Sequence, residues 1–125
     1  MCIELKAYIK LQDTDKILGA YNQATVLIEY VYGVYHPLHS TFSSFLGNYF
    51  LELRNFEKAL EYYEKSLNDA LRILGVDHVL TSAIYIDIAK LYKEMGSLEK
   101  SRIFLEKAYA IYETKKHVNT LPILT

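Results

Sequence analysis

The sequence predicts an all-α fold, a right-handed solenoid of three antiparallel helix pairs. The first observation is an internal repeat: parts of the chain match one another at one constant spacing. This spacing equals the separation between His36 and His78, and we call it the repeat length. A repeat of this size is typical of stacked supersecondary units, each of which needs its neighbours to bury its apolar face. The second observation is that six stretches show the apolar period of a helix and none alternates like a strand. The matching pairs are His36 with His78, Leu38 with Leu80, Ser40 with Ser82, Glu52 with Glu94, Glu57-Lys58 with Glu99-Lys100, and Glu64-Lys65 with Glu106-Lys107.

The first unit is expected to contain two helices. Residues 1–11 have apolar side chains at spacings of four, which predicts a short helix. Residues 12–15 are polar and include residue types that cap helices, so a break is expected there. A second helix is expected over residues 16–32, ended by Gly33. Its apolar stripe contains Ile17, Leu18, Tyr21, Ala24, Leu27, Ile28 and Val31.

The second unit begins at Tyr35-His36-Pro37, where proline suits the first turn of a helix and disfavours helix in the residue before it. Helices are expected over residues 38–53 and 56–74, with a tight turn at Arg54-Asn55 and a closing glycine at Gly75. Because the connections are short, consecutive helices must lie side by side. The apolar stripes contain Phe42, Phe45, Leu46, Tyr49, Phe50 and Leu53 in the first helix, and Ala59, Leu60, Tyr63, Leu67, Ala70 and Leu71 in the second.

The third unit repeats this plan after Asp77-His78. Helices are expected over residues 79–95 and 98–114, joined by a turn at Gly96-Ser97. The inward residues are Ile84, Ile88, Leu91 and Tyr92, then Phe104, Leu105, Ala108 and Tyr112. The chain is thus interpreted as one repeat domain over residues 1–114, with repeats at 1–33, 36–75 and 78–114. Residues 115–125, which include Pro122, are expected to form a tail without helical periodicity.

Composition excludes several classes of protein. The 14 basic and 15 acidic residues nearly balance, which disfavours the basic surface of a nucleic-acid-binding protein. Cys2 is the one cysteine, so neither an internal disulfide nor a multi-cysteine metal site is expected. No apolar run approaches the roughly 18 residues of a membrane span, and the N-terminus has no signal-peptide core. We therefore expect a soluble cytoplasmic protein without a cofactor or a membrane partner.

The helix positions resemble tetratricopeptide repeats, and the resemblance covers about residues 2–114. The repeat length and the Gly-x-x-His junctions at Gly33–Pro37 and Gly75–His78 are similar to the longer repeat of kinesin light chains. The first unit departs from the pattern at Glu4, where an apolar residue is expected. The resemblance implies a non-enzymatic adaptor that holds a protein or peptide in the groove lined by the first helix of each pair, with cytoskeletal association as one setting. The signature residues are Leu46-Gly47, Phe50, Ala59, Tyr63 and Ser66, then Ile88-Ala89, Tyr92, Ser101, Leu105 and Ala108.

The register of that family places Lys6, Asn48 and Lys90 in one row on the concave face, each one repeat length from the next. An amide between two ammonium groups could hold the backbone of an extended peptide and an acidic group on it. The alternative is an ordinary solvated helix face. The residues expected to bind the partner are Lys6, Ser44, Asn48, Leu51, Ile86, Lys90 and Lys93.

The histidines do not indicate a metal centre. His36 and His39 have a spacing that permits one metal ion, but no cysteine or carboxylate cluster completes a site. We expect the histidines at the junctions to form hydrogen bonds with the start of the next helix. No motif of a catalytic or phosphate-binding site is present, which predicts that the chain is not an enzyme.

The last expected helix is apolar on more than one face, and Ile103 and Tyr109 are its expected contacts with a partner. Repeat arrays normally end in a polar capping helix. We therefore expect a longer array, a homo-oligomer or a larger complex. Two alternatives to the adaptor stay open: a structural subunit with the ends of its array buried, and a regulatory segment of a multidomain enzyme.

Overall fold

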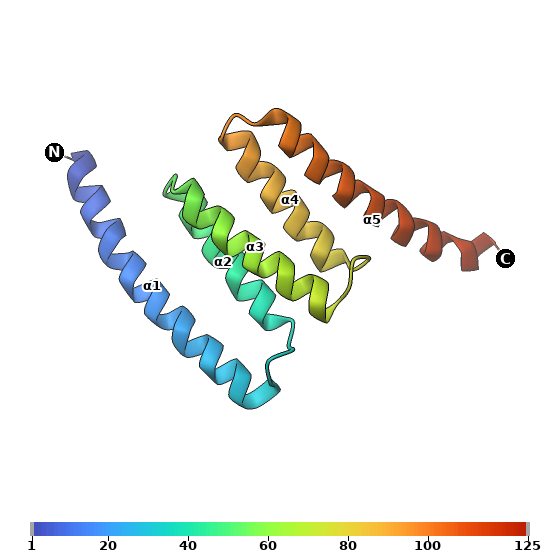
Figure 1. Ribbon diagram of the computed structural model, residues 1–125, viewed down its shortest axis with the longest axis horizontal. Helices are drawn as coiled ribbons and strands as arrows, with labels where there is room; N and C mark the ends of the chain where they lie inside the picture. The colour runs from blue at the N-terminus through green and yellow to red at the C-terminus, as the bar shows by residue number, and fades with distance from the viewer. Residues whose placement is uncertain (1, 125) are drawn as a thin grey trace.

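The computed structural model describes the backbone of residues 2–124 and the side chains of residues 13–114. Within residues 2–124 it contains five helices and no strand (Figure 1). They are α1 (Cys2–Tyr32), α2 (Leu38–Glu52), α3 (Phe56–Ile73), α4 (Val79–Glu94) and α5 (Leu98–Leu124). The predicted all-α solenoid is therefore confirmed. The predicted starts of α2, α3, α4 and α5 agree with the structure.

Two helix pairs, α2 with α3 and α4 with α5, form the body of the array, and α3 packs against α4 to join them. Equivalent aromatic stacks close the two pairs. The rings of Phe50 and Tyr62 are 5.5 Å apart between α2 and α3, and those of Tyr92 and Phe104 are 5.6 Å apart between α4 and α5. The two stacks are separated by one repeat length, so the sequence repeat is also a repeat of packing.

Helix α1 is the outermost helix at one end of the array (Figure 1). It lies against α2 through two hydrogen bonds, one between Tyr21 Oη and Ser43 Oγ at 3.0 Å and one between Thr14 Oγ1 and Tyr49 Oη at 2.8 Å. The Tyr21 ring also meets Tyr62 of α3 edge-on, with the ring centres 5.8 Å apart. Helix α1 approaches α2 along much less of its length than α3 does.

The core lies between α2, α3 and α4. Tyr63 of α3 and Leu91 of α4 are completely buried, and burying side chains of this kind is worth about 1.5–3 kcal/mol each. The polar groups in this layer are paired, because Ser40 Oγ donates to the carbonyl of Ser66 at 2.8 Å and Ser66 Oγ donates to the carbonyl of Ser40 at 2.6 Å. The main cluster consists of Leu46, Phe50, Ala59, Tyr63, Ala70, Ile84, Ile88 and Leu91.

The predicted glycines end their helices as expected. Gly33 and Gly75 have φ angles of 88° and 89°, in the left-handed region that glycine reaches without a steric penalty. The turns inside the two pairs also match, with φ of 60° at Arg54 and 84° at Gly96. Arg54 is a non-glycine residue in this region, which costs roughly 1–2 kcal/mol of backbone strain.

The prediction of two helices in the first unit is wrong. Residues 2–32 form one continuous helix, and the expected break at residues 12–15 is absent. Gln12 occupies the position of Arg54 and Gly96, so no glycine favours a turn there. Moreover, Glu4 and Leu5 occupy the positions of Leu46 and Gly47, so folding back would bury a carboxylate and place a leucine where the second unit requires glycine.

The prediction of a non-helical tail is also wrong, because α5 continues to Leu124. The residues after Thr114 include no glycine, the residue type that follows the helix ends at Gly33 and Gly75. The boundary of the repeat domain at residue 114 stays a prediction.

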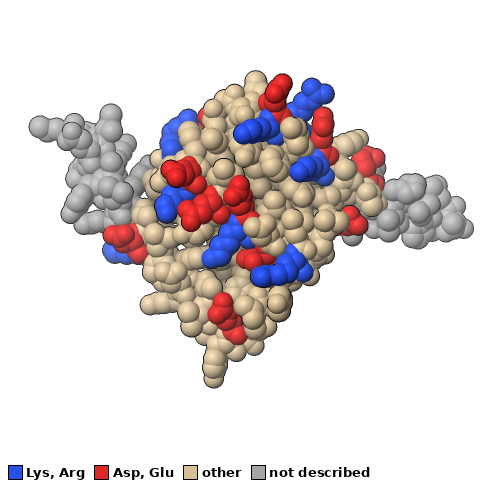
Figure 2. All heavy atoms as spheres, viewed as in Figure 1, with Lys and Arg blue, Asp and Glu red and all other residues tan. Residues whose placement is uncertain are grey.

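Acidic and basic side chains are interspersed on the face shown in Figure 2. Among the described residues, no helix is long and apolar enough to cross a membrane.

Candidate functional site

The first helices of the two complete pairs, α2 and α4, are connected by polar contacts. Near the middle of both helices, Ser44 Oγ donates to Asp87 Oδ2 at 3.1 Å. In the turn after α2, Arg54 Nη1 forms an ion pair with Oε2 of Glu94, the last residue of α4, at 3.2 Å. The face that α2 and α4 share is the one on which the sequence predicted the binding groove.

Asn48 lies on this face with a fixed orientation. The Tyr63 hydroxyl reaches through from α3 and donates to Asn48 Oδ1. Tyr63 is completely buried. Its pKa is raised well above the usual range, first by burial and then by the charge of Asp87, so the hydroxyl stays protonated and can donate. With Oδ1 occupied, the exposed Asn48 side chain presents its amide nitrogen as a donor to a ligand.

Asp87 is the functional candidate that the sequence reasoning missed. It is half-buried, and burial raises the pKa of its carboxyl group, while the hydrogen bond from Ser44 and the charge of Lys90 lower it. Its acidic character makes the face less basic than the predicted row of lysines. One signal was available in the sequence: Asp87 occupies the position of Phe45 in the preceding unit, so an apolar residue is replaced by a carboxylate beside the expected groove.

The predicted binding residues differ in how far they are exposed. Asn48, Lys90 and Lys93 are exposed on α2 and α4, whereas Ser44, Leu51 and Ile86 are half-buried. Lys6 lies outside the residues whose side chains are described. On α5, Ile103 and Tyr109 are 50% and 65% exposed, as a contact surface requires. The role of each of these residues in binding stays a prediction.

The junction histidines have the structural role that the sequence predicted. His36 Nδ1 accepts a hydrogen bond from the Leu38 amide at 3.2 Å, and His78 Nδ1 accepts one from the Leu80 amide at 3.0 Å. These bonds satisfy backbone donors at the starts of α2 and α4. Within the described side chains, no three histidine, cysteine or acidic residues gather where a metal ion could bind.

Serine contacts repeat in the same register. Ser40 Oγ donates to the carbonyl of Ser66, and one repeat length later Ser82 Oγ donates to the carbonyl of Ala108 at 3.3 Å. The two units therefore share their capping, their turns and their buried polar contacts. The profile of the tetratricopeptide repeat family matches residues 39–114, which is more than half of the chain. The chain belongs to the tetratricopeptide repeat family.

The repeat of this chain is kinesin-light-chain-like, as its similarity to two plant proteins shows. The chain is 32% identical over 69 residues to Protein KINESIN LIGHT CHAIN-RELATED 3 of Arabidopsis thaliana, and 30% identical over 67 residues to Protein KINESIN LIGHT CHAIN-RELATED 1 of the same plant. These matches cover 55% and 54% of the chain but 11% of each relative. The chain thus spans about a tenth of the length of these relatives.

Proposed function

We propose that this tetratricopeptide repeat is a non-enzymatic binding module that holds an extended peptide on the face shared by α2 and α4. The observation that supports this most directly is the fixed Asn48 amide. A side chain whose orientation is set before binding loses little entropy when a ligand arrives.

The chemistry of the face suits a peptide backbone with an acidic group nearby. The Asn48 amide nitrogen would donate to a backbone carbonyl, and Lys90 and Lys93 would attract a carboxylate. Leu51 and Ile86 would offer partly buried apolar contacts beside them. Asp87 weakens the preference for acidic groups, because its negative charge repels a strongly acidic ligand. We therefore expect a peptide with one or two acidic residues.

A peptide library displayed on phage and selected on the full chain tests this proposal. Selected peptides should bind Asn48→Asp at least about tenfold more weakly, which corresponds to about 1.4 kcal/mol. Asn48→Asp keeps an oxygen for the Tyr63 hydroxyl but removes the donor. Lys90→Glu should weaken binding similarly. Lys58→Glu, which removes one member of an exposed ion pair with Glu61 on α3, is the charge-matched control.

If the selected peptides bind Asn48→Asp and Lys90→Glu as they bind the parent chain, the shared face of α2 and α4 is not the binding site. Circular dichroism of each variant should show unchanged helix content, which separates lost binding from lost folding.

A second function rests on α5, whose apolar residues Ile103 and Tyr109 are exposed. We infer that they form a contact within a larger assembly. Ile103→Asp and Tyr109→Asp should then lower the mass of that assembly in light scattering after gel filtration, while Asn48→Asp leaves it unchanged. An assembly that survives both α5 substitutions would exclude this contact.

The names of the plant relatives concern kinesin light chains, and on that basis we infer a cytoplasmic location with cytoskeletal association. Co-sedimentation of the native protein with microtubules tests this inference, and a protein that stays in the supernatant at every microtubule concentration would contradict it.

A further inference from the structure

A cavity of about 380 Å³ lies between α1 and α2, and its walls are apolar side chains. Helix α1 contributes Ile17 and Ala24, and α2 contributes Phe42 and Phe45. Phe45 is 61% exposed, although it belongs to the apolar stripe of its helix. The α1–α2 cavity is separate from the peptide-binding face, because it lies on the side of α2 that faces α1.

The next unit shows what this surface looks like when it is covered. The residues one repeat length after Ile17, Ala24 and Phe42 are Ala59, Ser66 and Ile84, which are 0%, 0% and 1% exposed. Helix α2 covers them, since Ser40 of α2 forms hydrogen bonds with Ser66 and Gly47 of α2 lies against the Tyr63 ring. The α1–α2 cavity is therefore the equivalent surface without its covering helix.

Helix α2 also defines the chemistry of the missing helix. Its buried side chains are Ser40, Ser43, Leu46, Gly47 and Phe50, which form one uncharged stripe along the helix. Gly47 has no room for a side chain against Tyr63, so a small residue is required beside the large apolar one. A helix that fills the α1–α2 cavity should carry the same stripe.

The chain's own residues 2–11 do not meet this requirement. They stand one repeat before α2, where Glu4 and Leu5 replace Leu46 and Gly47. Burying the carboxylate of Glu4 without a partner is costly, and Leu5 is too large opposite Tyr21, the equivalent of Tyr63. In the structure these residues continue α1 instead of returning over α2.

We propose that the α1–α2 cavity is a docking site for an amphipathic helix of another protein, one whose buried stripe resembles that of α2. The interface would continue the packing already present between α2, α3 and α4. It is independent of peptide binding on the face shared by α2 and α4.

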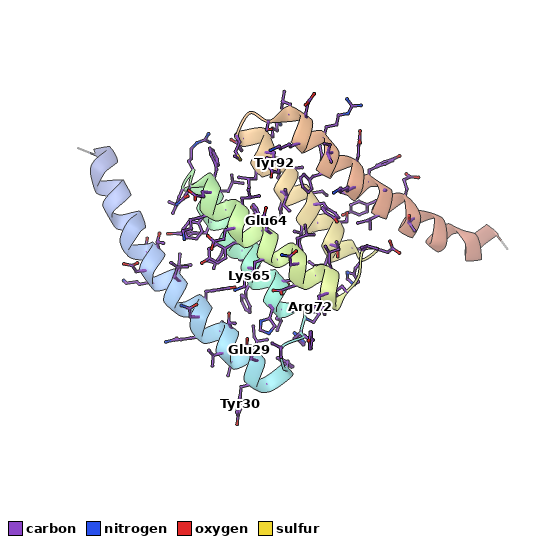
Figure 3. All side chains as sticks on the ribbon, in the orientation of Figure 1. Glu29, Tyr30, Glu64, Lys65, Arg72 and Tyr92 are labelled. Carbon is purple, nitrogen blue, oxygen red and sulfur yellow. The ribbon has the colours of Figure 1, made fainter. Side chains whose placement is uncertain are left out.

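The probe is a fluorescein-labelled synthetic peptide with the sequence of residues 37–53, titrated with the full chain and followed by anisotropy. We expect saturable binding that Ala20→Arg and Ala24→Arg each weaken at least tenfold. Both residues line the cavity, and Ser66, which lies one repeat length after Ala24, is buried against Ser40 of α2. Tyr30→Arg is the matched control, because Tyr30 points away from the other helices (Figure 3) and Arg72 is its equivalent on α3.

A second peptide carries Leu46→Glu and Gly47→Leu, the pair found at Glu4 and Leu5. We expect it to bind at least tenfold more weakly than the first. Equal binding of the two peptides would overturn the proposal, and so would binding of the first peptide that neither Ala20→Arg nor Ala24→Arg reduces.

Oxidation of a Phe45→Cys variant identifies the occupant. Cys2 and Phe45 are the equivalents of Ser44 and Asp87, whose side-chain oxygens are 3.1 Å apart, so Cys2 would reach residue 45 if residues 2–11 filled the cavity. We expect no more disulfide than in a Val26→Cys control, whose cysteine would lie at an exposed position of α1. An intramolecular disulfide would show that the chain fills its own cavity, and a disulfide-linked dimer would show that a second copy does. Either result overturns the proposal.

Discussion

Gly47 is the position where a single added methyl group should have the largest effect on the array. A Cβ atom there would lie 2.5 Å from Cε1 and 2.9 Å from Cγ of Tyr63. Carbon atoms pack best at about 3.5–4.0 Å, so the overlap is large. Because Tyr63 is completely buried, its ring cannot move aside without displacing its neighbours. We therefore expect Gly47→Ala to force α2 and α3 apart.

Two opposing terms set the magnitude of this effect. Overpacking of a tight core typically costs about 1–3 kcal/mol, and the rigid ring places Gly47→Ala at the upper end. Alanine gains roughly 1 kcal/mol over glycine inside a helix. The net loss in the free energy of unfolding should therefore be about 2 kcal/mol, which lowers the melting temperature by roughly 8 °C in a domain of this size.

Urea unfolding followed by circular dichroism measures this loss, and Gly19→Ala is the matched control. Gly19 lies inside α1, and a Cβ atom there meets nothing within 4 Å. That substitution should raise the free energy of unfolding by about 0.5–1 kcal/mol, because only the helix propensity changes. The same substitution thus has opposite signs at Gly19 and Gly47.

The third unit suggests a second-site change that should rescue the variant. Its equivalents of Gly47 and Tyr63 are Ala89 and Leu105, so alanine is paired there with a smaller side chain. Gly47→Ala combined with Tyr63→Leu should be more stable than the sum of the single losses by about 1–2 kcal/mol. If the two losses simply add, or if Gly47→Ala is as stable as Gly19→Ala, then Tyr63 does not clash with a side chain at position 47.

Three further predictions concern pH dependence and the helix ends. Burial raises the pKa of Asp87 above that of the unfolded chain, so the stability due to this residue falls as the pH rises through its native pKa. Asp87→Asn should be more stable than the parent chain at pH 7. This difference in the free energy of unfolding should shrink toward about pH 3, where the carboxyl group is protonated in both the folded and the unfolded chain. Urea unfolding across this pH range measures the difference, and a difference that grows on acidification would contradict the prediction. His78→Ala should lower the free energy of unfolding by about 1 kcal/mol and speed hydrogen exchange of the Leu80 amide, which donates to the imidazole. Unchanged exchange at Leu80 would mean that this helix cap contributes nothing. Arg54→Gly should gain about 0.5 kcal/mol, because relief of the left-handed strain exceeds the loss of an exposed ion pair and of the contact with the Phe56 ring. A loss on urea unfolding would show that the contacts of Arg54 with Glu94 and Phe56 dominate.

The parts of the fold that local chemistry determines could be predicted from the sequence. Glycine at Gly33 and Gly75 ends a helix because of its backbone freedom, and a histidine two residues before Leu38 or Leu80 reaches a backbone donor of the next helix. Such signals act within a few residues. They therefore need no knowledge of which helix packs against which.

The contacts that build the candidate site depend instead on distant parts of the chain. The hydrogen bond from Tyr63 to Asn48 spans 15 residues, and that from Ser44 to Asp87 spans 43. The repeat register could place Asn48 and Lys90 on one face, because that follows from periodicity. It could not show that a buried hydroxyl orients Asn48, since this depends on the depth at which α3 packs beneath α2.

The first unit shows why a repeat register does not guarantee a repeat of structure. Its missing turn glycine is an insufficient explanation, because Arg54 occupies the equivalent position in the second unit and accepts left-handed strain of roughly 1–2 kcal/mol. Burying the charge of Glu4 costs several kcal/mol, and Leu5 adds overpacking of about 1–3 kcal/mol. The sum of these two terms exceeds the strain at the turn. The packing surface, rather than the turn, therefore decides that α1 stays continuous and that its cavity with α2 is left for another helix.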